Sequence, residues 1–352
     1  RSAELRAAGR DIVALSTGEP DFPTPAHVVE AAYAAARSGE TRYPPTIGTA
    51  PLRAAIAARM GATPHEVIVS TGAKQVIANA FLATLDPGDE VIVPAPYWTS
   101  YPDIVALAGG VPVVVRCAMA RGFKLTPEAL ESAITPRTRW LMLNSPSNPA
   151  GATYSAEELA GLAQVLARHP GILILLDEIY ALLSYVPFAS FWRTCSELAS
   201  RTLIVDGVSK AYAMTGWRIG WGVGPADLVA AMAVVQGQTT SGACSIAQAA
   251  ALAALTGDQD FLIARRGVFR ARRDRVVATL NRLQGVSCPV PDGAFYAFPH
   301  LGEAADRLGF RTEAELCAAL MERAGVTVVS GRAFGLPGHA RISFAYSDAD
   351  LD

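Results

Sequence analysis

Short apolar runs alternate with helix-like segments through the middle of this chain, and this alternation limits the folds open to it. The runs are continuously apolar, which is typical of strands that are covered on both faces. We predict strands at residues 66–71, 90–93, 111–115, 140–143, 172–176, 203–205 and 219–223. The pattern predicts an α/β fold around a mostly parallel sheet, in which ligands bind beyond the carboxyl ends of the strands.

The pattern changes after residue 223. Helices are expected at 226–236, 246–256 and 258–283. A smaller α+β region follows, with strands expected at 294–298, 326–329 and 341–344. We predict a large domain of residues 41–270 and a small domain built from residues 1–40 and 271–352.

The charge and the cysteine content of the chain limit its expected binding partners and its expected cellular location. The chain has 30 Lys and Arg against 32 Asp and Glu, a net charge of −2, so neither nucleic acid nor a membrane surface is expected as a partner. Six arginines between residues 265 and 275 are interpreted as a solvent-exposed helix face. No apolar run reaches the length of a membrane-spanning helix. The five cysteines are scattered without a CxxC pair, which predicts no metal site and a cytoplasmic location.

One lysine stands at the end of an apolar, β-branched run. Residues 202–205 lead into a loop of small residues that presents Ser209 and Lys210, and Arg218 follows eight residues after the lysine. A lysine desolvated in such a loop has a lowered pKa, the state in which its amine forms a Schiff base. The arginine could hold a phosphate. An ordinary strand end with a solvated lysine and a structural arginine is the alternative.

A second strand end carries a possible anion site. Gly72 and Ala73 lie where a strand gives way to a helix, and the free amides and dipole of a helix N-terminus favour an anion. Lys74 sits in the first helical turn, where a cation opposes the dipole and points to a nearby anion. A plain strand-to-helix turn is the alternative for this segment.

Taken together, the motifs closely resemble those of class I aminotransferases, enzymes that use pyridoxal 5′-phosphate (PLP). The resemblance extends from Val13 to Ser347 and rests on the order of Gly18, Tyr43, Gly72, Trp98, Asn148, Asp177, Tyr180, Lys210, Arg218 and Arg341. It implies the PLP-dependent transferase fold type I, with a mostly parallel seven-stranded sheet in a large domain and a smaller α+β domain. It also implies a homodimer with shared active sites.

The resemblance implies a role for each of these residues. Lys210 would hold PLP and transfer the substrate proton, while Asp177 would pair with the ring nitrogen and Tyr180 with the ring 3′-oxygen. The implied cofactor contacts are Gly72, Ala73, Lys74, Trp98, Asn148, Asp177, Tyr180, Ser209, Lys210, Arg218 and, from the neighbouring subunit, Tyr43. The implied substrate contacts are Gly18, Lys74, Trp98, Asn148 and Arg341.

Residues 72–75 and 214–218 are most similar to the bacterial aspartate aminotransferase subgroup that includes aspartate/prephenate aminotransferases. In that subgroup a lysine at the position of Lys74 helps to recognise the distal carboxylate of the substrate. We therefore expect ping-pong amino transfer from L-aspartate to 2-oxoglutarate. The alternatives are prephenate, aromatic or alanine-type substrates, or a PLP β/γ-lyase of the same fold. A PLP-sensing regulator is disfavoured, because no helix-turn-helix or basic extension occurs in the sequence.

Overall fold

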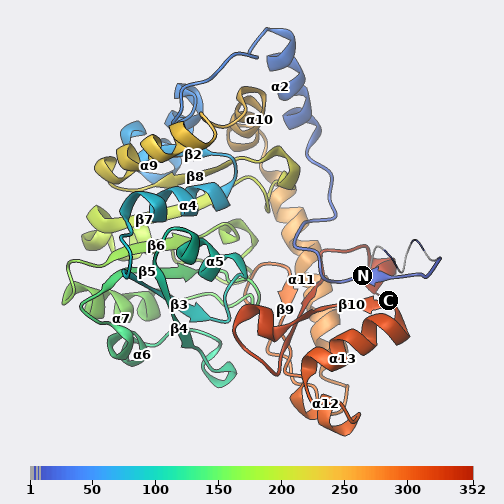
Figure 1. The fold of residues 1–352 in the computed structure, drawn as a ribbon. Helices are drawn as coiled ribbons and strands as arrows, with labels where there is room; N and C mark the ends of the chain where they lie inside the picture. The colour runs from blue at the N-terminus through green and yellow to red at the C-terminus, as the bar shows by residue number, and fades with distance from the viewer. Residues whose placement is uncertain (1–3, 5–6, 8, 352) are drawn as a thin grey trace.

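A seven-stranded sheet runs through the larger part of the molecule (Figure 1), in a computed structural model that describes residues 4, 7 and 9–351. Its strands follow the order β2-β8-β7-β6-β5-β3-β4, and β8 is antiparallel to both of its neighbours. The mostly parallel sheet predicted from the sequence is confirmed. Its bounds are β2 (Val67–Ser70), β3 (Glu90–Ala95), β4 (Val111–Arg116), β5 (Thr138–Asn144), β6 (Leu173–Asp177), β7 (Thr202–Gly207) and β8 (Gly220–Val223).

Helices cover both faces of this sheet, which explains why its strands are continuously apolar. In β5, Trp140 and Met142 pack on one face and Leu141 and Leu143 on the other, and all four are buried. The first face carries α4 (Ala73–Thr84), α5 (Ser100–Leu107) and α9 (Ala226–Thr239). The second carries α6 (Pro127–Ala133), α7 (Ala156–Ala167) and α8 (Phe191–Thr194).

The segments before β2 and after α9 complete the molecule. Two of the helices there, α2 (Ala26–Arg37) and α3 (Ala50–Met60), pack against α10 (Ser245–Thr256). A longer helix, α11 (Asp260–Leu280), leads away from the large sheet. Residue 270 lies inside α11, and the division into residues 41–270 and a small domain stays a prediction. The outer ends of that predicted small domain include residues 1–3, 5–6, 8 and 352, which lie outside the described part of the chain.

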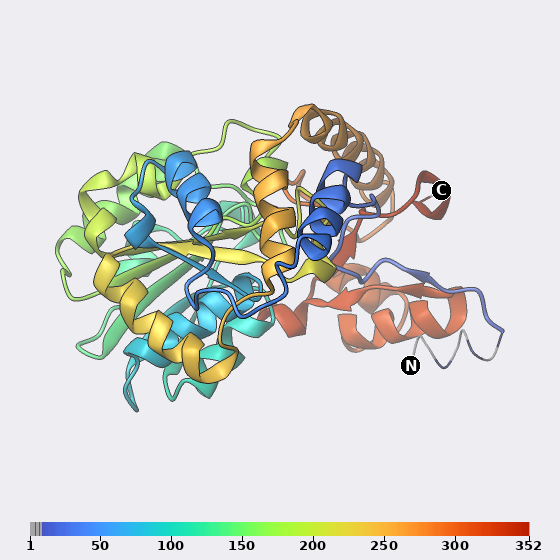
Figure 2. The same cartoon turned by 90° about the horizontal axis from the view of Figure 1, so that it is seen from above.

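A smaller α+β part follows α11 and takes in the N-terminal strand (Figures 1 and 2). β9 (Tyr296–Ala297), β12 (Ala340–Ser343) and β11 (Val329–Ser330) form an antiparallel sheet. β1 (Val13–Ala14) pairs in parallel with β10 (Val326–Thr327). The remaining helices are α12 (Gly302–Arg307), α13 (Glu313–Ala319) and α14 (Asp348–Leu351).

Two strand predictions in this smaller part are wrong in detail. The strand expected at 326–329 is two strands, because the chain changes partner at Val328, from β1 to β12. The strand expected at 294–298 is shorter, since Ala294 has a left-handed backbone with a φ of 58° that an extended strand does not allow.

The six arginines of α11 do not form one exposed face, since only Arg266 and Arg270 are exposed. Arg272 and Arg273 are buried, and Arg272 bridges Asp21 near the N-terminus and Asp348 near the C-terminus at 2.9 and 3.1 Å. Arg265 donates to the carbonyl of Pro23 at 2.6 Å. These contacts fasten both ends of the chain to one helix, and they are why the expectation of a solvated face was wrong.

No helix among the described residues combines the length and the apolar character needed to cross a membrane.

Candidate active site

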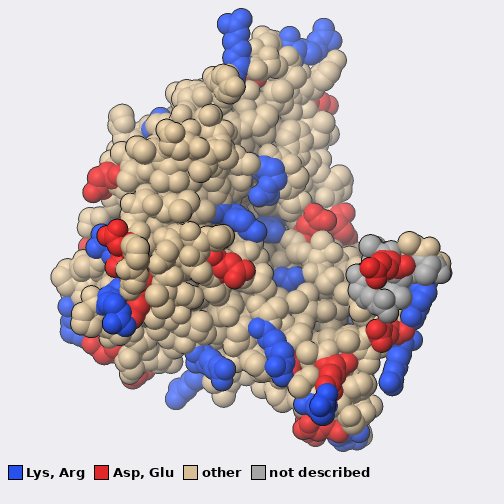
Figure 3. Space-filling model, in the orientation of Figure 1, with Lys and Arg blue, Asp and Glu red and all other residues tan. Residues whose placement is uncertain are grey.

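A pocket lies at the carboxyl ends of β5, β6 and β7, where the smaller α+β part faces the sheet. Its volume is about 520 Å³. In the space-filling view, several Lys and Arg atoms lie in and beside the hollow between the two parts, and one patch of Asp or Glu atoms also borders it (Figure 3). The basic residues among its lining are Lys74, Lys210, Arg218 and Arg341. Their number and placement make this an anion-binding pocket.

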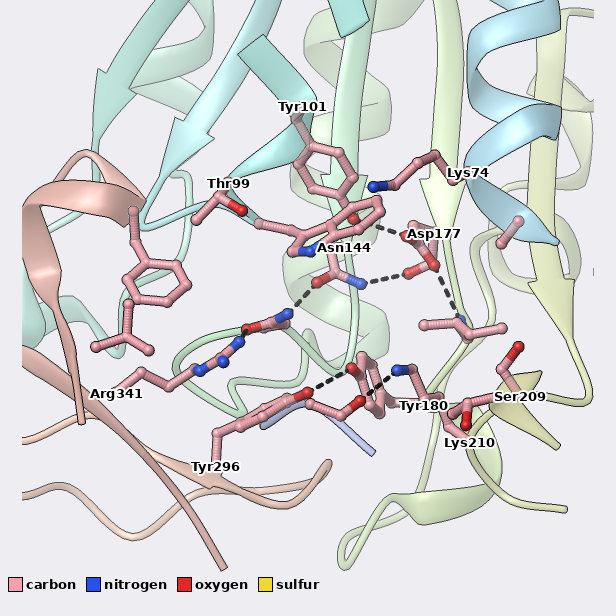
Figure 4. Close-up of a pocket in the computed structure, with 18 of the residues that line it drawn as sticks. Lys74, Thr99, Tyr101, Asn144, Asp177, Tyr180, Ser209, Lys210, Tyr296 and Arg341 are labelled. Carbon is pink, nitrogen blue, oxygen red and sulfur yellow. Dashed lines mark hydrogen bonds between the residues drawn. The ribbon is translucent and has the colours of Figure 1, made fainter. Parts of the chain in front are cut away.

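Lys210 enters the pocket from the loop that follows β7. Its Nζ donates to the carbonyl oxygen of Gly18 at 2.6 Å, so the N-terminal segment closes one side of the pocket (Figure 4). Burial lowers the pKa of Lys210 to about 8, although the nearby Asp177 carboxylate opposes the shift. An amine in this state is available as a nucleophile and base near neutral pH.

Asp177 is the last residue of β6, and both of its carboxylate oxygens are held. Oδ2 accepts a hydrogen bond from the Tyr101 hydroxyl at 2.7 Å, and Oδ1 accepts one from the backbone amide of Ile179 at 3.1 Å. Burial raises the pKa of Asp177, while these two hydrogen bonds and the charge of Lys210 act to lower it. The carboxylate is therefore fixed in orientation at the floor of the pocket (Figure 4).

Two tyrosines meet beside the lysine. The hydroxyls of Tyr180 and Tyr296 are 2.9 Å apart, and both side chains are buried. The Nζ of Lys210 lies 5.8 Å from the centre of the Tyr180 ring. Burial raises the pKa of both phenols, so both keep their protons and can donate hydrogen bonds at neutral pH.

Arg341 reaches the pocket from β12 on the opposite side. It donates to Asn148 Oδ1 at 3.0 Å and to the carbonyl of Ser16 at 2.6 Å, and its guanidinium lies between the rings of Tyr296 and Phe334. Its Nε is buried and has no hydrogen-bond partner within the described chain. A planar guanidinium with a spare donor and no carboxylate of its own suits a carboxylate from outside.

The N-terminus of α4 forms a second anion-binding corner. No side chain caps this helix, and Ala73 lines the pocket at its first turn. Gly72 has a φ of 85°, and a Cβ placed there would lie 2.5 Å from Nη2 of Arg218. Arg218 itself has a left-handed backbone, with a φ of 58° that is rare outside glycine. The close approach of the arginine to the helix N-terminus therefore requires glycine at position 72.

Lys74 and Trp98 face each other across the mouth of the pocket. The Lys74 Nζ lies 4.8 Å from the centre of the Trp98 ring, within the range of a cation–π contact. Trp98 in turn packs edge-to-face against Tyr101, with ring centres 5.4 Å apart. Lys74 is exposed and forms no salt bridge within the described chain.

The structure gathers nearly all the predicted site residues. Those that line the cavity are Gly18, Ala73, Lys74, Trp98, Asn148, Asp177, Tyr180, Ser209, Lys210, Arg218 and Arg341. Gly72 lies against Arg218 just behind this lining. Tyr43 is the exception, because it is 94% exposed and lies outside this cavity. That Tyr43 reaches into a neighbouring subunit stays a prediction.

Sequence reasoning missed five polar residues of the pocket: Thr99, Tyr101, Asn144, Thr215 and Tyr296. Tyr101 and Tyr296 hydrogen-bond to Asp177 and Tyr180, and Asn144 donates from Nδ2 to the carbonyl of Asp177 at 2.8 Å. Asn144 ends β5 next to Asp177 in register, so its position at a strand end was a usable signal. The two tyrosines gave no such signal.

Comparisons with known proteins agree with this geometry. The family model for aminotransferase class I and II matches residues 10–352. The chain belongs to this family. An aspartate/prephenate aminotransferase of Cereibacter sphaeroides is 50% identical over the whole chain and 91% of its own length. The crystal structure of the aspartate aminotransferase from Rhizobium meliloti has a TM-score of 0.96 at 49% identity, covering all of this chain and 91% of that one.

A further solved structure, the Thermus thermophilus aspartate aminotransferase with maleate, has a TM-score of 0.94 at 43% identity and covers 99% of this chain and 91% of its own. The protein is thus a class I aminotransferase of the bacterial aspartate subgroup, with fold type I and PLP as its cofactor.

The residues of the pocket fit PLP. The open N-terminus of α4, Ser209 and Arg218 offer donors for a phosphate, and Gly220 keeps that corner open, because a Cβ there would lie 2.2 Å from the Ala73 amide nitrogen. Lys210 supplies the amine, and Asp177 supplies the buried carboxylate that suits a protonated pyridine nitrogen.

Proposed function

We propose that this aminotransferase transfers the amino group of L-aspartate to 2-oxoglutarate in a ping-pong cycle. Aspartate and 2-oxoglutarate each carry two carboxylates. The four basic residues of the pocket form no salt bridge within the described chain, and with Lys210 and Arg218 assigned to PLP, Arg341 and Lys74 remain for the substrate. The Thermus thermophilus relative is titled as a structure with maleate, itself a dicarboxylate. The main support for the proposal is that Arg341 and Lys74 can each bind one of the two carboxylates of such a substrate.

In this proposal Arg341 and Asn148 bind the α-carboxylate, and Lys74 binds the distal one. Arg341 presents a planar guanidinium for two parallel hydrogen bonds, and Asn148 is held beside it at 3.0 Å. Gly18, whose carbonyl contacts Lys210, closes over the substrate from the N-terminal side. Trp98 fixes the ammonium of Lys74 through its ring face.

PLP, when bound, supplies the electron sink that stabilises negative charge at the substrate Cα. Lys210 Nζ accepts the proton from that carbon and later returns a proton to complete the transfer. Asp177 would accept a hydrogen bond from the protonated pyridine nitrogen, and Tyr180 would donate to the ring 3′-oxygen. Ser209, Arg218, Gly72 and Ala73 hold the phosphate.

Two wider features belong to the same proposal. The 94% exposure of Tyr43, beside an open groove lined by residues 240–246, supports a homodimer in which Tyr43 reaches the phosphate site of the partner subunit. The five cysteines are all free, which is in keeping with a cytoplasmic enzyme.

Prephenate as amino acceptor is a second candidate. The relative from Cereibacter sphaeroides carries aspartate/prephenate in its name. Prephenate has two carboxylates, so the same two cations would receive it. Steady-state rates with 2-oxoglutarate and with prephenate as acceptors, measured at saturating L-aspartate, rank the two.

A half-reaction tests the proposal directly. PLP-loaded protein is mixed with L-aspartate and no oxo acid, and the visible absorption of the cofactor is followed together with the products. We expect the visible band to be lost and one equivalent of the oxo acid of aspartate to form per site, without ammonia. Release of ammonia would indicate a lyase, and an unchanged band would exclude aspartate as the donor.

A further inference from the structure

Tyr101 is the residue that joins the two sides of the cofactor site. It lies in the first turn of α5, and its amide donates to the carbonyl of Trp98 at 2.9 Å. Its ring packs edge-to-face on Trp98, and its hydroxyl donates to Asp177 Oδ2 at 2.7 Å (Figure 4). One side chain thus contacts both Trp98, which the family resemblance implies as a cofactor contact, and the carboxylate proposed to face the ring nitrogen.

The direction of the hydrogen bond between Tyr101 and Asp177 is fixed. Burial, together with the neighbouring Asp177, raises the pKa of Tyr101 well above its ordinary value, so the phenol keeps its proton. Tyr101 is only 3% exposed, so water does not compete for its hydroxyl. The ionised Asp177 is therefore the acceptor of this hydrogen bond, and the bond favours that ionised form.

The geometry leaves Asp177 little freedom. Tyr101 holds Oδ2 and the Ile179 amide holds Oδ1, while Asn144 and the amide of Ser145 hold the backbone carbonyl of Asp177 at 2.8 and 3.1 Å. A carboxylate accepts more than one hydrogen bond per oxygen, so each oxygen retains a lone pair for a further donor. Because Asp177 lines the cavity, a ligand bound there can supply that further donor.

We propose that Tyr101 is a positioning residue for transamination, whose hydroxyl keeps Asp177 ionised and aimed at the pyridine nitrogen of PLP. The inference rests on the proposed role of Asp177 as partner of that nitrogen. Burial alone raises the pKa of Asp177, and the Tyr101 hydroxyl is the largest of the contacts that oppose the rise. Without that hydroxyl, Asp177 is more readily protonated, and the ring nitrogen loses its anionic partner.

The test compares Tyr101→Phe with Tyr154→Phe. Tyr154 is a suitable control because it is equally buried, yet its hydroxyl accepts from the Leu125 amide at 2.8 Å and does not contact Asp177. In holoenzyme loaded with PLP labelled with ¹⁵N in the ring, we expect the nitrogen resonance of Y101F to move toward the unprotonated position. We expect Y154F to match the wild type. The kcat with aspartate should fall about tenfold in Y101F with a much smaller change in KM.

A second measurement separates this inference from the proposed function. In the cofactor-free full chain, the Asp177 carboxyl is titrated by ¹³C NMR, with Asp177→Asn to assign the signal. We expect the pKa of Asp177 to be higher in Y101F than in the wild type. If wild-type PLP shows no protonated ring nitrogen, the proposed role of Asp177 fails, and this titration still tests the contact with Tyr101.

Two results decide the outcome. An unchanged ¹⁵N resonance and an unchanged Asp177 titration in folded Y101F would overturn the inference. If Y101F does not fold, 3-fluorotyrosine at position 101 replaces it. The hydroxyl of 3-fluorotyrosine is a stronger donor, so the Asp177 titration should move to lower pH, and no movement would again overturn the inference.

Discussion

The pocket and the arginine cluster on α11 use the same kinds of charged residue in opposite ways. On α11, Arg272 is buried between two carboxylates of its own chain, Asp21 and Asp348. In the pocket, Arg341 contacts only neutral acceptors, and Lys210 donates only to a backbone carbonyl among the described residues. The structural arginine is paired with carboxylates of its own chain. The basic residues of the pocket have no such ion pair among the described residues, which leaves their charges available for a ligand.

Lys210 gives the largest expected effect. Lys210→Ala removes the only lysine whose amine faces Asp177 and Tyr180 in the described pocket, and with it the group proposed to move the substrate proton. We expect kcat for aspartate to fall by at least about 10⁴-fold. Lys124→Ala is the matched control, since Lys124 is paired with Glu158 away from the pocket. Comparable losses in both variants would contradict the assignment.

Arg341 gives the next effect. Arg341→Lys keeps the charge but loses the planar pair of donors, so we expect kcat/KM for aspartate to fall about 100-fold, mainly through KM. Steady-state kinetics over a range of aspartate concentrations measure this. A change below about threefold would show that the α-carboxylate binds elsewhere.

A substitution of Arg272 should lower the stability of the protein and leave its activity nearly unchanged. Arg272→Ala removes the ion pair with Asp21 and one of the two with Asp348, which keeps Arg275 at 3.2 Å. Because Asp348 is also largely exposed, we expect a loss of only about 1–3 kcal/mol in the free energy of unfolding. Urea unfolding measures the loss, and kcat/KM should stay within about threefold of wild type. A stable but inactive R272A would mean that the α11 cluster belongs to the active site.

The smallest effect is the pH dependence of cofactor incorporation. Burial lowers the pKa of Lys210 to about 8, so the cofactor-free protein carries the reactive free amine above that pH and loses it as the pH falls. The rate of PLP incorporation should rise about tenfold per pH unit below pH 8 and then level off. A rate that continues to rise to pH 10 would show that Lys210 keeps the pKa of an ordinary lysine.

Local patterns in the sequence allowed the fold and part of the pocket to be predicted. Apolar runs marked the strands, and Lys210 stood out in the loop after the run that forms β7. The roles of Asp177, which ends β6, and of most other pocket residues came from the resemblance to class I aminotransferases. Parallel strands bring such positions to one edge of a sheet.

What was missed depends on contacts between distant segments. Tyr101 meets Asp177 across 76 residues of sequence, and Tyr296 meets Tyr180 across 116. No periodicity within α5 or β9 shows that a hydroxyl will find a partner there. The arginines of α11 were misjudged for the same reason, since Asp21 lies 251 residues away from Arg272.

The most direct test of this account is to find which amine carries the cofactor. PLP-loaded protein is reduced with borohydride, digested and analysed by mass spectrometry, with Lys74 in the same pocket as the internal comparison. We expect the phosphopyridoxyl group on Lys210 in nearly all molecules and not on Lys74. Modification of Lys74, or of a lysine outside the pocket, with Lys210 unmodified would contradict it.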